Sequence, residues 1–302
     1  MDYAKQTPYS DPGEYAHLFD ALPDDIPAIG AVVRNLLIHY RGGGIEFTGD
    51  RLAEIDNRWV SAILATDQRR NGTALAVPRE AVDHVVGCCR DYTLLFVSAL
   101  RHKGIPARSR IGFAVYFGEG FNFDHVVAEY WNGDRWVMTD AQLDPADGHP
   151  FNTLDMPPGP FVSAAEVWRD ARAGRIDPDL YGVQPGLAIT GDELDTSRPG
   201  SVALGGLWFI RTYVHHQLAH LMGDELLLWE GWGTMAPTYT EADAAETDEL
   251  AALLIAADTG DTTATQALTD RYPALAPNGR TLLTSPSGHP HKWVDLTHPL
   301  SE

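Results

Sequence analysis

The sequence predicts an α+β fold, with a helix packed on a small antiparallel sheet and a mostly helical second half. Three observations predict it. Apolar residues recur at helical spacing in several stretches of the first hundred residues. Alternating apolar runs flank Asn132-Gly133, which is the strongest short-range signal for a β-hairpin. Residues 201–222 are apolar on most sides, as expected for a deeply buried helix.

Length, composition and charge restrict the class of protein. A chain of 302 residues can bury a substantial core, and 44% hydrophobic with 21% charged residues is typical of an ordinary globular protein. The 22 Lys and Arg residues against 42 Asp and Glu residues give a net charge of −20. Such a charge repels phosphate backbones and anionic membrane surfaces. We therefore expect neither a nucleic-acid partner nor a membrane partner.

The cysteines and the N-terminal residues indicate a reducing compartment. Cys88 and Cys89 are adjacent, so their Cα atoms lie about 3.8 Å apart, whereas ordinary disulfides need about 4.4–6.8 Å. Residues 1–6 lack the basic start and apolar run of a signal peptide, and no run of about eighteen apolar residues follows. We expect a cytoplasmic protein, in which a thiol stays reduced.

Three helices are predicted in the first half, after an irregular stretch over residues 1–22. Local residues mark their ends: the carboxylates of Asp24 and Asp25 with Pro27 at the start of the first helix, Asp50 as the candidate N-cap of the second, and Gly104 after the third. The predicted helices are residues 26–40, 51–68 and 87–103.

A strand rich in β-branched and aromatic residues follows at residues 105–117, and it is expected beside the hairpin in an antiparallel sheet. Arg108 and Arg110 lie on this strand. They could bind a substrate carboxylate, but a salt bridge within the fold is the favoured interpretation.

The hairpin register follows from the length of its loop. A two-residue loop at Asn132-Gly133 pairs Trp131 with Asp134, and the same register places His125 opposite Asp140. Directly opposed residues share one face of a sheet, with Cβ atoms about 4.5–5.5 Å apart. The Asp140 carboxylate is thus predicted to accept a hydrogen bond from the His125 imidazole.

Cys89, at the start of the third helix, supplies the third member of a catalytic set. A helix N-terminus and a nearby imidazolium both favour the thiolate form of cysteine. Cys89, His125 and Asp140 therefore have the residue types of a nucleophile, a base and the group that orients the base. Taken singly, the cysteine could be a small buried hydrophobe and the His–Asp pair a structural sheet contact. Their agreement with helix position and register favours catalysis.

From about Trp59 to Asp144 the chain resembles the transglutaminase-like cysteine acyltransferases and hydrolases. The nucleophile position falls on Cys89 rather than Cys88, because Cys89 directly precedes Arg-Asp-Tyr. The motifs that carry the resemblance are Gly-x-Cys-Arg-Asp-Tyr at 87–92, Leu-Arg-x-x-Gly-Ile-Pro-Ala-Arg at 100–108, Asp-His-x-x-x-Glu at 124–129 and Arg-Trp-x-x-x-Asp at 135–140.

The resemblance implies a papain- or transglutaminase-like core and assigns roles to single residues. Cys89 takes the nucleophile position, His125 the base position and Asp140 the orienting position. Trp59 and Arg90 are assigned to binding of the oxyanion or the substrate. No cofactor and no metal ion are implied.

The function predicted from these residues is acyl transfer from an amide or ester through a cysteine thioester. Water as the acceptor would make the protein an amidase or peptidase, and an amine would make it an amide-forming acyltransferase. The substrate is a small molecule, a peptide or a protein. The alternative is a binding protein that keeps this fold without turnover.

The second half is predicted to be a helical extension. A Pro- and Gly-rich loop covers residues 144–160, and Ser163 with Glu166 forms a capping box that opens a helix through Ala173. Further helices are predicted at residues 201–222 and 249–257, and a short strand at 292–294. We divide the chain into a catalytic core, residues 1–160, and an extension, residues 161–302, that packs on the core as one body.

His215, His216 and His220 form a competing cluster in the buried helix. His216 and His220 are spaced i, i+4, as in helical metal sites. The zinc-protease signature requires Glu directly after the first His, and here Gln217 stands there instead, so no metal is expected. These histidines are either structural or, with residues 229–232, part of the wall of the substrate cleft.

Overall fold

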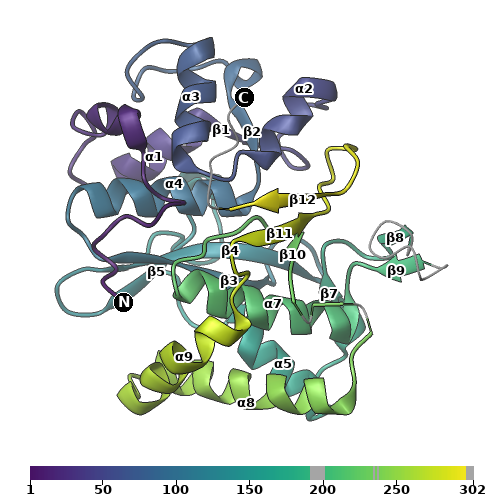
Figure 1. Ribbon diagram of the computed structural model, residues 1–302. Helices are drawn as coiled ribbons and strands as arrows, with labels where there is room; N and C mark the ends of the chain where they lie inside the picture. Colours follow the sequence, from purple (N-terminus) through teal and green to yellow (C-terminus); the bar gives the residue numbers. More distant parts are fainter. Residues whose placement is uncertain (191–200, 234, 237, 297–302) are drawn as a thin grey trace. The chain divides into compact units, whose positions relative to one another are not determined.

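The computed structural model describes residues 1–190, 201–233, 235–236 and 238–296, and Figure 1 shows the helices and strands that they form. Helices and a small sheet occur together, which confirms the predicted α+β class. Strand β4 runs antiparallel to β5, and β3 runs antiparallel to β6. The five-stranded sheet contains, in sheet order, β5 (Trp136–Thr139), β4 (Asn122–Trp131), β3 (Ala107–Ala114) and β6 (Phe161–Ser163), with β7 (Tyr181–Gly182) parallel to β4.

The chain forms two compact units that interleave along the sequence. The predicted boundary at residue 160 does not coincide with them, because strands β3 and β4 contribute to both units and a late segment belongs to the first. The first unit comprises Met1–Arg110, Val126–Pro157 and Gly223–Leu227, and the second comprises Ile111–His125, Pro158–Met222 and Leu228–Glu302.

Helices dominate the N-terminal part of the first unit. Besides strand residues of the five-stranded sheet, it contains η1 (Gly13–Leu18), α1 (Ile26–Leu36), β1 (Leu37–His39), α2 (Gly49–Leu52), η2 (Ala53–Asp56), α3 (Val60–Arg70), η3 (Ala81–Asp83), β2 (Val85–Gly87), α4 (Cys89–His102) and η4 (Pro145–Asp147), where η denotes a 3₁₀ helix.

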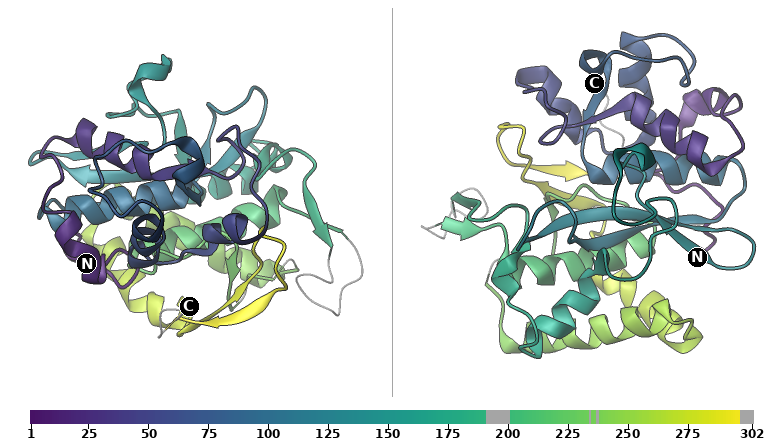
Figure 2. Two further views of the ribbon diagram at one scale, coloured as in Figure 1. Left: turned by 90° about the horizontal axis from the view of Figure 1, so that it is seen from above. Right: turned by 180° about the vertical axis from the view of Figure 1, so that it is seen from behind.

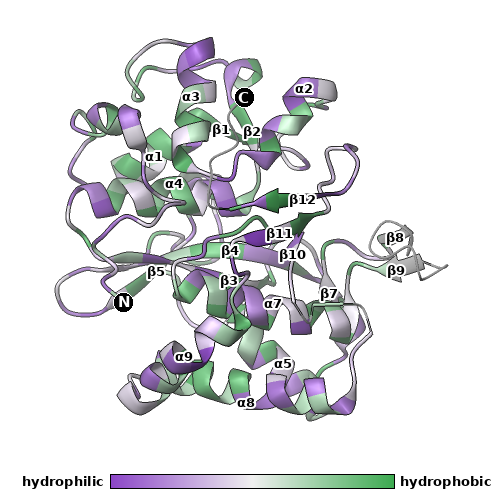
Figure 3. Cartoon of the chain, viewed as in Figure 1, coloured by the Kyte–Doolittle hydropathy of each residue, from purple (hydrophilic) through white to green (hydrophobic). Residues whose placement is uncertain are grey.

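Helix α4 lies at the centre of the first unit, in contact with α1, α3, β1 and β2. Its apolar middle, Leu94 to Val97, is buried, and Figure 3 shows this hydrophobic stretch between more hydrophilic ends. Two of the predicted caps are confirmed: Asp25 accepts the backbone N–H of Ala28 at 3.0 Å at the start of α1, and Gly104, at φ 75°, follows the end of α4. The predicted N-cap at Asp50 is wrong, because Asp50 lies in the first turn of α2, whose N-cap is Thr48.

The predicted helix at residues 51–68 is wrong, because two short turns, α2 and η2, precede α3. The break lies at Asn57 and Arg58. Their backbone carbonyls accept hydrogen bonds from the guanidinium of Arg90, at 3.4 and 2.5 Å. A carbonyl used in this way is not available to the next turn of a helix. Trp59 consequently becomes the N-cap residue of α3.

The second unit contains most of the helices of the C-terminal half. Its elements after β6 are α5 (Ala164–Arg172), η5 (Pro178–Leu180), β7, β8 (Ala188–Thr190), β9 (Ser201–Ala203), α7 (Gly206–Leu221), β10 (Glu230–Gly231), α8 (Glu241–Asp258), α9 (Thr262–Leu275), β11 (Arg280–Leu283) and β12 (Lys292–Asp295).

Helices α5, α7 and α8 pack against one another, and the views of Figure 2 show them in teal, green and yellow-green. The capping box of Ser163 and Glu166 is confirmed at the start of α5. Helix α7 is buried almost all round, as predicted, but it begins at Gly206 rather than at Ser201, because residues 201–203 pair with β8 as a strand. In the described part of the chain, no helix combines the length and apolar character needed to cross a bilayer.

Candidate active site

Cys89 is the first residue of the fourteen-residue helix α4, and Cys88 is its N-cap. The two ends of the first turn bond reciprocally: the Cys88 thiol accepts the N–H of Asp91, and the Asp91 carboxylate accepts the N–H of Cys88 at 2.8 Å. Gly87 makes room for this, since a Cβ at residue 87 would lie 2.9 Å from Asp91 Oδ2. The motif Gly-x-Cys-Arg-Asp therefore encodes a tight helix start at the cysteine.

The charged residues next to the two cysteines, Arg90 and Asp91, are buried. A hydrogen bond with Cys89 and burial raise the pKa of the Cys88 thiol well above its ordinary value. Burial also raises the pKa of the Asp91 carboxyl, and the Arg90 guanidinium, 2.9 Å away, offsets part of that effect. The Cys88 thiol therefore stays protonated and can serve as a hydrogen-bond donor.

Arg90 is 1% exposed and bonds to the protein itself. Its guanidinium donates to the carbonyls of Asn57, Arg58 and Glu225. The side chain thus joins the start of α4 to two loops of the first unit, and a substrate that bound to Arg90 would have to displace these bonds.

Trp59 lies at the start of α3, in the loop that Arg90 holds. Its side chain is largely buried, with the guanidinium of Arg58 5.2 Å from its ring centroid. Its carbonyl accepts the N–H groups of Ala62 and Ile63, at 3.0 and 3.1 Å. The position of Trp59 is thus fixed by the helix it caps and by the Arg90 contact with the preceding residue.

The predicted register of the hairpin is wrong by two residues. Trp131 pairs with Trp136 rather than with Asp134, so the loop has four residues, 132–135. The side chain of Asn132 is the cause, because its Oδ1 accepts the N–H of Asp134 at 3.0 Å and the N–H of Arg135 at 2.9 Å. This side-chain turn lengthens the loop beyond the two residues that Asn-Gly predicts.

The corrected register removes the direct opposition of His125 and Asp140 but keeps them on one face. Thr139 pairs with Ala128, so the next step along the strands brings Asp140 to the level of Val127. Residues two apart on a strand share a face, and His125 is therefore the diagonal neighbour on the face of Val127. A shift of two residues preserves the face that a shift of one would have lost.

Asp140 is buried at the end of β5, where two bonds hold it. Its N–H donates to the carbonyl of Thr153 at 3.0 Å, and its Oδ1 accepts the N–H of Gln142, also at 3.0 Å. The carboxylate is thus fixed by the loop that follows the strand.

Helix α4 is fastened to strand β4 within the first unit. The Thr93 hydroxyl donates to the carbonyl of Val126 at 2.8 Å. Thr93 lies one turn after Cys89 on the same helix face, and Val126 is the residue directly after His125. Sequence reasoning missed this residue, because a single threonine in an apolar stripe carries no signal of its partner.

His125 is buried, with aromatic rings beside it in the second unit. Tyr116 and Phe117 meet its ring edge-on, with centroids 5.9 and 4.9 Å away. The neighbouring Asp124 is fixed by the Tyr213 hydroxyl, which donates to its Oδ2 at 2.6 Å. Arg108 and Arg110, by contrast, both pair with Glu129, as the favoured structural interpretation predicts.

Comparison with known proteins supports the resemblance. Residues 51–141 match the family model described as the transglutaminase-like superfamily, which identifies this stretch as a transglutaminase-like region. The matched range contains Cys89, His125 and Asp140. At the level of the superfamily, this match indicates a cysteine-dependent enzyme. No curated protein matches the sequence significantly.

A solved structure is similar over about half of the chain. It is the crystal structure of a candidate cysteine protease from Cytophaga hutchinsonii, with 17% sequence identity and a TM-score of 0.33. The match covers 53% of this chain and 44% of the other.

The histidine cluster lies in α7, in the second unit. His216 and His220 have ring centroids 6.5 Å apart, and among the described residues no group of three or more His, Cys, Asp or Glu side chains is placed to hold a metal ion. Burial lowers the pKa of His215 to about 4 and that of His216 to about 3, so both imidazoles are neutral at pH 7. His215 and Trp232 line a common cavity of this unit.

Proposed function

We propose that the chain is a cysteine-dependent acyl-transfer enzyme in which Cys89 is the nucleophile, His125 the general base and acid, and Asp140 the group that orients the imidazole. The observation that carries the proposal is the position of Cys89 as the first residue of α4, inside the range that matches the transglutaminase-like family. The positive end of the helix dipole favours a thiolate at that position.

Two contacts support the roles of His125 and Asp140. The Thr93–Val126 hydrogen bond fixes the helix of the nucleophile to the strand segment that follows His125. The register of β4 and β5 keeps His125 and Asp140 on one face of the sheet. A base whose tautomer is set by a carboxylate is the usual partner of a catalytic thiol.

The proposed reaction has two steps. The Cys89 sulfur attacks the carbonyl carbon of an amide or ester, and the tetrahedral intermediate collapses to a thioester as His125 protonates the leaving amine or alcohol. His125 then removes a proton from water or from an acceptor amine, which attacks the thioester and releases the thiol. Asp140 stabilises the imidazolium that exists within each step while His125 holds the transferred proton. No cofactor takes part in this scheme.

The backbone N–H of Cys89 and the indole N–H of Trp59 are the proposed donors to the oxyanion. Both lie in parts of the first unit that Arg90 holds, since its guanidinium bonds to the carbonyl before Trp59. Arg90 acts in this scheme as a positioning residue rather than as a substrate ligand.

The proposed substrate carries an amide or ester in a small molecule, a peptide or a protein. The net charge of −20 disfavours nucleic acids and anionic membranes as partners. A reducing cytoplasm is the proposed compartment, because Cys88 and Cys89 do not form a disulfide.

Paired cysteine variants test the proposal. Labelling of the thiol is measured by intact mass at pH 7 after incubation with an activated ester, which acylates the sulfur, or with a chloroacetamide, which alkylates it with loss of chloride. We expect Cys89→Ala to abolish labelling and to lower turnover by at least about 10³-fold, as loss of a catalytic nucleophile does. Cys88→Ala should be labelled at Cys89 and should keep most activity.

Two results would contradict the proposal. An inactive Cys88→Ala beside an active Cys89→Ala would move the nucleophile by one residue. Equal, slow labelling of both cysteines in the wild-type protein would indicate a binding protein of this fold rather than an enzyme.

A further inference from the structure

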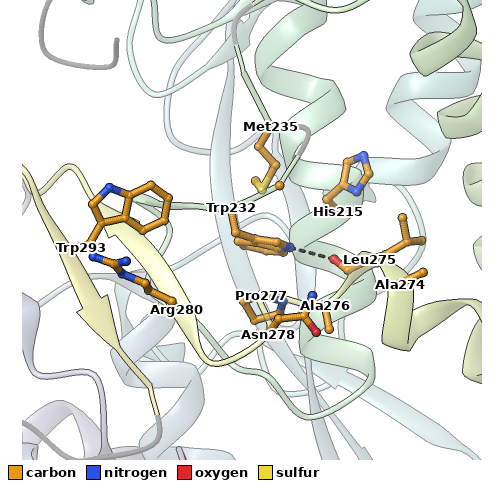
Figure 4. A pocket seen from close by; sticks show the side chains of 11 residues that line it. His215, Trp232, Met235, Ala274, Leu275, Ala276, Pro277, Asn278, Arg280 and Trp293 are labelled. Atoms are coloured by element: carbon orange, nitrogen blue, oxygen red, sulfur yellow. Dashed lines mark hydrogen bonds between the residues drawn. The ribbon is translucent and has the colours of Figure 1, made fainter. Parts of the chain in front are cut away.

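The second unit contains a cavity that the proposed reaction does not use. Its volume is about 400 Å³, within the usual range of small-molecule sites. Its lining residues are His215 of α7, then Trp232, Gly233 and Met235, then the end of α9 with the loop that follows, and Arg280 and Trp293 of β11 and β12. Figure 4 shows Trp232 between His215 on one side and Arg280 with Trp293 on the other.

The floor of this cavity is apolar and aromatic. Trp232 and Met235 are buried, and Pro277 lies beside them. The indole of Trp232 is held in place, because its Nε1–H donates to the carbonyl of Leu275 at 2.8 Å and the ring of His216 meets it edge-on at 5.0 Å. A fixed indole face of this kind is a platform for a planar ligand.

A buried polar atom at the cavity has no partner. His215 is 4% exposed, and within the described part of the chain its Nε2 makes no hydrogen bond. A buried polar atom without a partner costs about 1–3 kcal/mol, so the group gains when a ligand supplies one. According to its tautomer, this nitrogen can accept a hydrogen bond from a hydroxyl or amide group or donate one to a hydroxyl or carbonyl oxygen.

The rim of the cavity carries a positive charge. The guanidinium of Arg280 lies over the ring of Trp293 at 4.9 Å, and Trp293 is 54% exposed. None of the described lining residues is an Asp or Glu. A ligand cation would therefore meet only the like charge of Arg280, whereas a carboxylate would find a guanidinium that can bond to both of its oxygens.

We propose that this cavity binds a small aromatic carboxylate that carries a hydroxyl or another hydrogen-bonding substituent on its ring. The ring packs on Trp232 and Met235, the carboxylate pairs with Arg280, and the substituent reaches Nε2 of His215. None of its described lining residues has a role in the cysteine chemistry proposed above, and its occupancy does not require turnover.

Isothermal titration of the full-length Cys89→Ala variant at pH 7.5 tests the proposal. Three probes differ by one group each: 4-hydroxyphenylacetate, phenylacetate without the hydroxyl, and 4-hydroxyphenylacetamide without the charge. We expect 4-hydroxyphenylacetate to bind with one-to-one stoichiometry. Each of the other probes should bind at least about tenfold more weakly, equivalent to about 1.4 kcal/mol.

Variants assign each contact to a residue. In Arg280→Gln the acid should lose its advantage over the amide, and in His215→Leu the hydroxyl acid should lose its advantage over phenylacetate. Arg271→Gln is the matched control, since Arg271 is an exposed arginine of α9 that pairs with Glu249 and lies outside the cavity lining. Far-ultraviolet circular dichroism verifies that each variant is folded.

For each variant we compare the ratio of the affinities for two probes. A general loss of affinity leaves this ratio unchanged, so a change in the ratio reports the loss of one particular contact. Absence of saturable binding of the hydroxyl acid up to about 10 mM, weaker than any affinity expected of a specific site, would overturn the proposal. Equal affinities for the acid and the amide in the wild-type cavity would also overturn it. The wild-type protein and Cys89→Ala should bind the probe within about twofold of each other, which separates this proposal from that of the enzyme.

Discussion

Two clusters of buried polar groups, one in each unit, are arranged in contrasting ways. In the first unit, the guanidinium of Arg90 bonds to three backbone carbonyls and to Asp91, and Arg101 pairs with Glu225 at 2.9 Å. In the second unit, neither Nε2 of His215 nor Nδ1 of His216 has a hydrogen-bond partner among the described residues.

The contrast distinguishes buried groups that hold the backbone in position from buried groups that can bind a ligand. Buried charges whose bonds are all to the protein fix the backbone around them, because each bond is expensive to break in a low-dielectric interior. The first unit uses them to hold the loop of Trp59 and the start of α4. A neutral imidazole nitrogen without a hydrogen bond holds no backbone segment in position, and it can bond to another molecule instead.

Removal of the second half should have the largest effect. Residues 223–227 belong to the first unit, where Leu226 and Leu227 are fully buried and Glu225 pairs with Arg101. A chain truncated after residue 160 loses these partners, and we expect it to be insoluble or to lack a cooperative thermal transition. A soluble, cooperatively melting and fully active fragment would show that the first half forms an independent domain.

A point variant isolates the charge from the truncation. Glu225→Gln in the full chain leaves Arg101 buried beside a neutral group, and breaking a buried pair typically costs about 3–5 kcal/mol. Glu241→Gln is the matched control, because Glu241 is 77% exposed in its pair with Arg172 and such pairs contribute little. Urea unfolding curves of both variants give the difference in the free energy of unfolding.

Arg90→Lys should have the next largest effect. The lysine keeps the charge, but its single ammonium does not span the carbonyls of Asn57, Arg58 and Glu225. We expect a loss of about 2–4 kcal/mol of stability from bonds to a charged group and a marked fall in acyl-enzyme formation. Should stability fall while the labelling rate of Cys89 stays at the wild-type value, Arg90 would have no part in positioning the nucleophile.

The local signals in the sequence account for what was predicted well. The caps at Asp25 and Ser163, the cysteine at the start of a helix and the location of the hairpin each depend on residues within a few positions of one another. Likewise, the burial of α7 follows from its composition alone.

The failures have distant or competing causes. The break before Trp59 comes from a guanidinium 32 residues away, and no local pattern encodes it. The hairpin register depends on whether the Asn132 side chain or the backbone closes the turn, and both agree with Asn-Gly. Helix α9 was not predicted at all, and its last turn contains Pro273, a residue that is unfavourable inside a helix.

Acidification should affect the second unit to a moderate extent. The folded pKa values of His215 and His216, about 4 and about 3, lie below the ordinary 6.5, so the unfolded chain binds more protons between these values. The stability they contribute is fully present above about pH 6.5 and is lost as the pH falls toward 4. The charge of Arg211 adds to the effect at His215, which burial dominates.

Melting temperature as a function of pH measures this loss. His215→Leu should flatten the curve between pH 6.5 and 4, whereas replacement of the exposed His17 by Gln should leave it unchanged. A wild-type melting temperature that does not change between pH 6.5 and 4 would show that the unbonded imidazole nitrogens of the second unit cost the fold no stability. The energetic argument for the contrast between the two units would then fail.

Cys88→Ala should have the smallest effect and should sharpen the account of the first unit. It removes one of the two reciprocal bonds of the capping box, since the bond from the Cys88 N–H to Asp91 at 2.8 Å does not need the thiol. A lost N-cap costs about 0.5–2 kcal/mol, and a sulfur acceptor places the value at the low end. Cys88→Ser supplies a better cap and should recover the stability.

The alkylation rate of Cys89, measured as a function of pH, gives the second readout. If Cys88 only caps the helix, both variants keep the wild-type profile. If its protonated thiol also donates to the Cys89 sulfur, Cys88→Ala shifts the profile to higher pH and Cys88→Ser, which keeps a donor, restores it. A shift of the profile in both variants would mean that the sulfur atom of Cys88, rather than a hydrogen bond from it, controls the reactivity of Cys89.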